Sequence, residues 1–202
     1  ASYSFYIDGT ADRLVDPPAD LTTDIACFGT VSLALEPGAS RYAALLKNLH
    51  RDGTFIALDP NIRPFYATKA HSDFLYSLLP SVDLLKLSDE EEEFLDQPEA
   101  PIKVITCGPD GLIVHFNGQT IEVTAPAIEV ADTIGAGDTV IGCLLAEIHR
   151  RTGGKNVRSK TMEFTGEDWA EIASYAARAA AVTCTRVGAN PPTRAEMEQL
   201  PE

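Results

Sequence analysis

The segment VADTIGAGDTVIG, Val130 to Gly142, places two glycines and an aspartate where a polar turn gives way to an apolar run. At the start of a helix, Gly135, Ala136 and Gly137 would leave backbone N–H groups unpaired, and the helix dipole adds partial positive charge there. Such an end attracts phosphate, and small residues let an oxygen approach the backbone. From these residues alone, a phosphate cradle and a plain glycine turn are about equally good interpretations.

Asp138 follows this turn directly. A carboxylate beside a phosphate site can take a proton from an attacking hydroxyl, which accelerates transfer by about 10²- to 10⁴-fold. The alternative is a first-turn acid that only complements the helix dipole. Two other nucleotide motifs do not fit, because Val140 stands where GxGxxG needs its last glycine, and no GK is followed by serine or threonine.

The rest of the chain alternates between strand-like and helix-like patterns. Helices are predicted at 39–50, 67–79, 89–95, 135–150 and 167–183, and strands at 2–8, 25–31, 54–59, 82–88 and 102–108. A hairpin of 112–117 and 120–125, joined by Gly118 and Gln119, follows the last of these strands. Residues 151–166 are predicted to be a polar loop, and the tail ends in a short helix. This alternation predicts an α/β fold with a mostly parallel sheet.

The length, composition and net charge of the chain exclude several classes of function. The 202 residues, 45% hydrophobic, suit one globular domain or one large domain with a small appendage. Acidic residues outnumber basic ones 30 to 16, giving a net charge of -14 without a basic stripe, so no nucleic-acid partner is expected. No run of the sequence approaches a membrane span and no signal-peptide pattern opens it, so no membrane partner is expected.

The cysteines lie far apart in apolar segments, without a CxxC pair or a histidine at ligand spacing. This pattern favours buried free thiols in a reducing compartment, with the cytoplasm as the default, over disulfides or a metal site. The four residues are Cys27, Cys107, Cys143 and Cys184.

The letters around the glycines carry a further signal. All seven positions of DTIGAGD, Asp132 to Asp138, resemble the signature of the ribokinase-like, or PfkB-type, carbohydrate kinases. The resemblance implies a three-layer α/β/α fold, ATP with Mg²⁺ as cofactors and a sugar as substrate. It also implies that Asp138 is the catalytic base and that the amides of Gly135, Ala136 and Gly137 hold the transferring phosphoryl group.

Two more segments resemble elements of this family. TCGPDG, which begins at Thr106, resembles the TxGxxG turn that contacts nucleotide phosphates and ribose, here through Thr106, Gly108 and Gly111. DPNIR ends a predicted strand, at the sheet edge where ligands bind, and Arg63 could pair with phosphate oxygens in bidentate fashion. Without context, a proline-directed turn with a surface arginine is the favoured interpretation, by about two to one. It resembles the DxNxR element of fructokinases and 2-keto-3-deoxygluconate kinases.

KLSDEEEE, which begins at Lys86, allows two interpretations. Ser88 and Glu91 have the spacing of a capping box, which explains them without any ligand. The family usually has NxxE here, and fructokinase-like members resemble the serine form. The resemblance implies that Lys86 and Ser88 contact the nucleotide and that Glu91 organises Mg²⁺ through water. The remaining acids are expected to form a solvated face.

TCTRVGANPP, which begins at Thr183, resembles the C-terminal segment whose carbonyl groups hold a monovalent cation, so K⁺ is a candidate cofactor. The cation positions that the resemblance implies are Asp132, Thr133, Thr183, Arg186 and Gly188. The sequence departs from the family at Pro192, where some members have serine. On the residues alone, the segment is a helix end followed by a turn.

The resemblance starts part-way through the family layout, because the strands with the sugar site and the GG hinge have no counterpart here. We therefore expect the C-terminal two thirds of a sugar kinase with residues missing, and a second gap near 94–104. Residues 1–24 would form a lid strand and return segment, and 25–202 the nucleotide-binding domain. Lids of this family often pair between subunits, so a homodimer is expected.

The expected activity is that of a fructokinase. The alternatives are a kinase for 2-keto-3-deoxygluconate or another acceptor of the family, and a non-catalytic homologue that keeps the fold. An intact Asp138 beside an intact Gly-Ala-Gly argues against the non-catalytic homologue.

Overall fold

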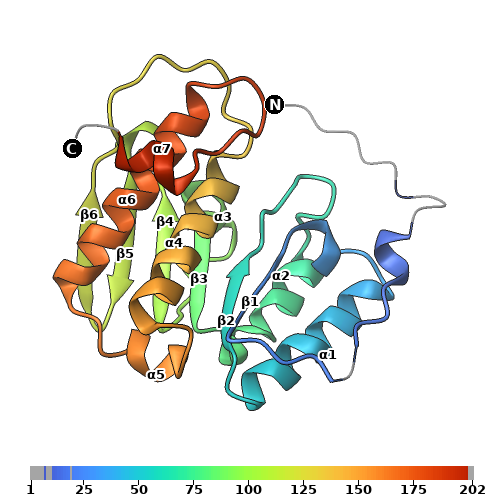
Figure 1. The fold of residues 1–202 in the computed structure, drawn as a ribbon. Helices are drawn as coiled ribbons and strands as arrows, with labels where there is room; N and C mark the ends of the chain where they lie inside the picture. Colours follow the sequence, from blue (N-terminus) through green and yellow to red (C-terminus); the bar gives the residue numbers. More distant parts are fainter. Residues whose placement is uncertain (1–6, 8–10, 19, 200–202) are drawn as a thin grey trace.

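A six-stranded sheet runs through the computed structural model, which describes residues 7, 11–18 and 20–199 (Figure 1). The strands follow one another across the sheet in chain order, and β1 to β4 are parallel while β5 and β6 are antiparallel to their neighbours. They are β1 (Ile25–Gly29), β2 (Phe55–Asp59), β3 (Leu84–Ser88), β4 (Ile102–Thr106), β5 (Leu112–Phe116) and β6 (Gln119–Val123).

Helices cover both faces of this sheet. The face with α1 (Gly38–Arg51), α2 (Lys69–Tyr76) and α3 (Asp89–Phe94) is opposite the face with α4 (Ala136–Thr152), α5 (Val157–Thr161) and α6 (Gly166–Cys184). Figure 1 shows α4 and α6 side by side, with α7 (Arg194–Glu198) beyond the end of α6. Short 3-10 turns lie at Asp12–Leu14, Thr30–Leu33, Leu79–Ser81 and Gly108–Asp110.

The side-chain alternation of β2 explains the two cores. Phe55 and Ala57 pack into the core under α4 and α6, whereas Ile56 and Leu58 pack into the core under α1 and α2. A strand buried on both faces has a continuous apolar run, which is what the sequence shows at this point. The predicted three-layer α/β/α fold with a mostly parallel sheet is confirmed.

Three predicted boundaries were wrong, each for a local reason. The hairpin turns at Asn117 and Gly118, not at Gly118 and Gln119, because their positive φ angles of 48° and 72° suit a type I′ turn. The strand predicted at 25–31 stops at Gly29, since Thr30 has a positive φ of 60°. The helix predicted at 67–79 stops at Tyr76, and Pro80 lies in a separate 3-10 turn.

The predicted polar loop at 151–166 contains the short helix α5. Val157 and Thr161 are its buried residues, and the Thr161 hydroxyl donates to the Val157 carbonyl at 2.7 Å. Two buried positions in five residues are too few to give a periodic pattern. The strand predicted at 2–8 lies, Ile7 apart, outside the described residues. The rest of the expected lid is described at 11–18 and 20–24, and it contains a 3-10 turn at Asp12–Leu14.

All four cysteines are free thiols, as predicted, but the predicted burial was wrong, because Cys27 is exposed and the other three are half-buried. Cys27 lies in β1, the outermost strand at one side of the sheet as far as the structure describes it. Among the described helices, none has the length and apolar character that a membrane crossing requires.

Candidate active site

The first turn of α4 has the geometry of an anion cradle. Gly135 precedes it with a φ of 80°, and a Cβ there would lie 2.9 Å from Ala189 Cβ. No side chain caps this helix end. The Ala136 N–H donates to the Thr133 carbonyl at a long 3.3 Å. The turn therefore presents small residues and backbone N–H groups to whatever lies over it, as predicted from Gly135, Ala136 and Gly137.

A large apolar cavity opens beside this turn. Its volume is about 600 Å³, and its wall on α6 is formed by small residues, Ala177, Ala180 and Ala181. The site residues predicted by the sequence that line it are Thr106, Gly108, Gly111, Thr133, Ala136 and Gly137. Cavities of this size, mostly apolar with a few polar groups, are typical of cofactor sites.

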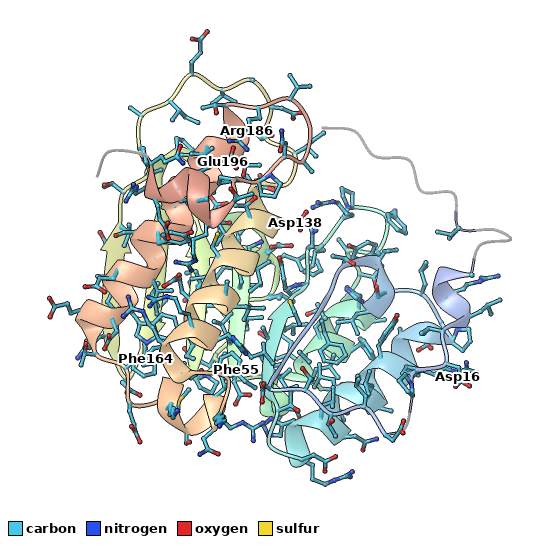
Figure 2. The ribbon with its side chains drawn as sticks, in the orientation of Figure 1. Asp16, Phe55, Asp138, Phe164, Arg186 and Glu196 are labelled. Atoms are coloured by element: carbon cyan, nitrogen blue, oxygen red, sulfur yellow. The ribbon has the colours of Figure 1, made fainter. Side chains whose placement is uncertain are left out.

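A second cavity, of about 330 Å³, lies on the other side of the same turn. Asp138 lines it, together with Asp59 and with residues of β1 and the turn after it, among them Cys27 and Ser32. Figure 2 labels the exposed Asp138 at the N-terminal end of α4. Because Gly137 lines one cavity and Asp138 the other, the two cavities meet at consecutive residues.

A buried ion pair lies beneath the first turn. Lys86 and Asp59 are each 5% exposed, and Lys86 Nζ donates to the two Asp59 carboxylate oxygens at 3.1 and 3.2 Å. Burial raises the pKa of Asp59 to about 6, against the attraction of Lys86, which lowers it. Asp59 was not among the predicted site residues, and only its place at the end of a buried strand could have indicated it.

Glu91 joins two segments of the site. One of its carboxylate oxygens accepts from the N–H of Ile62 and the other accepts from Ser88 N at 2.8 Å. Ser88 Oγ in turn accepts from Glu91 N at 3.2 Å, so the predicted capping box is confirmed. The DPNIR segment and the start of α3 are thereby fixed to each other. Glu92, expected on a solvated face, instead pairs with Lys103 at 2.7 Å.

Nine predicted residues line neither of the two cavities: Arg63, Lys86, Ser88, Glu91, Asp132, Gly135, Thr183, Arg186 and Gly188. Arg63 is half-buried in the segment after β2. Within the part of the chain that the structure describes, no three Asp, Glu, His or Cys side chains form a group that could hold a metal ion.

The predicted cation residues come together where two distant loops meet. The Asp132 carboxylate accepts from Ile134 N at 3.0 Å and from Gly188 N at 2.9 Å. These hydrogen bonds from Ile134 and Gly188 lower the pKa of Asp132. Ala131 N and Asp132 N both donate to the carbonyl of Cys184, the last residue of α6, at 2.8 and 3.2 Å.

Thr183 and Arg186 have other partners in this region. The Thr183 carbonyl accepts from Arg186 N at 3.0 Å, and its fully buried hydroxyl lies 2.9 Å from that of Thr139. Thr139 Oγ1 also lies 2.8 Å from the Gly135 carbonyl, so the hydroxyl pair connects α6 to the cradle. The Arg186 guanidinium pairs with Glu196 of α7 at 2.7 Å, and Figure 2 labels both residues.

The chain is similar over most of its length to known proteins. Residues 23–196 match the family model described as pfkB family carbohydrate kinase. The chain is 33% identical over 168 residues to a fructokinase of Rhizobium leguminosarum bv. trifolii, covering 73% of this chain and 51% of that protein. It is 26% identical over 218 residues to fructokinase-2 of Solanum habrochaites, covering 96% of this chain and 64% of that protein.

A solved structure supports the fold. The fructokinase of Vibrio cholerae O395, with fructose, ADP and a calcium ion bound, matches with a TM-score of 0.75 at 22% identity. The match covers 93% of this chain and 64% of that one. The chain thus spans less than two thirds of the length of each of these three relatives.

Proposed function

Because the chain belongs to the pfkB family of carbohydrate kinases, we propose that its protein transfers the γ-phosphoryl group of ATP to a sugar hydroxyl, with fructose as the acceptor. The observation that carries the proposal is the meeting of two cavities at the first turn of α4. A nucleotide in the larger cavity would direct its phosphates at that turn, and an acceptor in the smaller one would lie beside Asp138. Fructose is favoured by the relatives named fructokinase.

The residues at and beneath the first turn of α4 each have a role in the proposed reaction. Bound MgATP would supply the phosphoryl group. Asp138 would accept the proton of the attacking sugar hydroxyl. The hydroxyl oxygen bonds to the γ-phosphorus while the bond between that phosphorus and ADP breaks. The N–H groups of the turn would stabilise the charge on the phosphoryl oxygens, and the Lys86 ammonium would neutralise part of it. Amides and one lysine thus bind a polyanion in a protein with a net charge of -14.

The family resemblance assigns further roles in the proposed site. Glu91 would organise Mg²⁺ through water, Thr106, Gly108 and Gly111 would contact the nucleotide, and Arg63 would approach the phosphates. K⁺ at the Asp132 loop, a homodimer formed through the lid, and the division into a lid at 1–24 and a nucleotide-binding domain at 25–202 remain proposals of the family resemblance. The free cysteines suit a reducing compartment such as the cytoplasm.

The test measures ADP release by the complete protein with fructose, ribose, 2-keto-3-deoxygluconate and nucleosides as acceptors. We expect fructose to give the highest kcat/KM. Asp138→Asn, which keeps the size of the side chain, should lower kcat by about 10²- to 10⁴-fold while ATP still binds. If no acceptor of the panel supports turnover, or if Asp138→Asn keeps full activity, the proposed function is refuted. A higher kcat/KM with another acceptor would refute fructose alone.

A further inference from the structure

Asp59 and Lys86 face the same helix from neighbouring strands. In β2, Phe55, Ala57 and Asp59 are spaced by two residues, so they lie on the same face of the strand. Phe55 and Ala57 pack under α4 and α6. In β3, Lys86 follows Leu84 of the same core. Successive side chains of a strand alternate between faces, so both charged groups are directed to the α4 side. Their burial there follows from the alternation of the strands.

The lysine ammonium lies against the cradle. A Cβ built on Gly137 would lie 3.1 Å from Lys86 Nζ, so a side chain at this position would crowd the ammonium. Two of the hydrogen bonds that Lys86 makes end on the Asp59 carboxylate. An ammonium has three donors, so this arrangement leaves one for a group that lies over the first turn of α4.

The stability of the fold does not explain why Asp59 and Lys86 are buried as a pair. Desolvation of two buried charges costs about as much as their attraction returns, and apolar residues of similar volume are often at least as stabilising. Lys103 and Glu92 form a comparison within the same chain. They pair at 2.7 Å from β4 to α3, and Glu92 retains 22% exposure of its side chain. Lys103 follows Ile102 by one residue, so it points to the face opposite α4.

We propose that Asp59 is a positioning residue that holds the Lys86 ammonium under the first turn of α4, where Lys86 contacts the transferring phosphoryl group. This inference rests on the proposed function and adds to it the residue through which Lys86 is held in place. A charge fixed before the reaction needs no rearrangement during it, and loss of such placement can cost about 10²-fold in rate.

The test is a double-mutant cycle on the complete protein with Asp59→Asn, Lys86→Met and both together. We expect each single variant to lower kcat by about 10²-fold with a much smaller change in the KM for ATP. If Asp59 acts through Lys86, the double variant is no slower than Lys86→Met. It also contains no unpaired buried charge, so it should fold. Losses that multiply in the double variant, or normal kcat in Asp59→Asn, would overturn the inference.

Two further measurements separate this inference from the proposed function and from a structural effect. Binding of ATP and of ADP, measured by calorimetry, needs no acceptor, and we expect the preference for ATP to fall about 10-fold in Asp59→Asn and Lys86→Met. An unchanged preference would overturn the inference even where turnover fails for want of the right acceptor. Glu92→Gln breaks the comparison pair and should lower the melting temperature without lowering kcat. Equal loss of kcat in Glu92→Gln would mean that any broken pair has this effect, which also overturns the inference.

Discussion

Replacement of Gly135 by alanine tests the cradle directly. An L-residue in the left-handed region costs about 1–2 kcal/mol, and Gly135 has a φ of 80°. The new Cβ would also lie 2.9 Å from Ala189 Cβ and 3.1 Å from Ala189 Cα, so the turn after Gly188 must move. Such overpacking adds about 1 kcal/mol. Together these terms predict a loss of roughly 2–3 kcal/mol in the free energy of unfolding, or roughly 5–10 °C in Tm for a chain of this size.

Gly142→Ala is the matched control on the same helix. Gly142 is exposed, and a Cβ there would meet no heavy atom within 4 Å. Alanine should therefore raise stability by about 0.5–1 kcal/mol, because glycine in a helix interior is unfavourable. Urea denaturation can be followed by fluorescence of Trp169, which is fully buried and is the single tryptophan of the chain. If Gly135→Ala is as stable as Gly142→Ala, the described geometry of the cradle is wrong.

Three further predictions concern the surroundings of the cradle. Burial places the folded-state pKa of Asp59 at about 6, above the usual 3.8, so its protonation contributes stability that is full below 3.8 and lost as pH rises through 6. Urea denaturation at a series of pH values should show the unfolding free energy of wild type falling by on the order of 1–3 kcal/mol relative to that of Asp59→Asn across that window. A difference between the two proteins that does not change with pH would contradict the prediction. Ala180→Leu should fill the larger cavity and weaken ATP binding by at least about 10-fold in calorimetry, and equally tight binding would place the nucleotide elsewhere. Thr183→Val removes the hydroxyl next to Thr139 and should lower the unfolding free energy by about 1 kcal/mol with an unchanged m-value.

Much of the fold could be predicted because the strands are buried on both faces. The strand predicted at 54–59 contains the apolar run Phe55 to Leu58, and β2 lies there with an error of one residue at its start. The predicted hairpin turn is one residue too late, because its place depends on which two residues adopt positive φ, and these are Asn117 and Gly118. The helix α5 could not be predicted, since tertiary contacts of Val157 and Thr161 hold it in place.

The sequence predicts the individual segments of the site but not the contacts between residues that are distant in sequence. Local letters were enough for Gly135 to Asp138 and for the capping box of Ser88 and Glu91, because both depend on residues a turn apart. The pairing of Asp59 with Lys86 depends on which strands are neighbours in the sheet. The hydrogen bond from Gly188 to Asp132 joins residues 56 positions apart. Neither distance in sequence leaves a periodic signal.

The two cavities draw on different stretches of the chain. All residues that line the larger one lie between 106 and 184, whereas most that line the smaller one lie between 27 and 42. Under the proposed function, substitutions in that early stretch would alter which acceptor is recognised while the donor site stays intact. Such a layout would let a lineage exchange one substrate for another through changes in a short region, with the shared first turn of α4 preserved throughout.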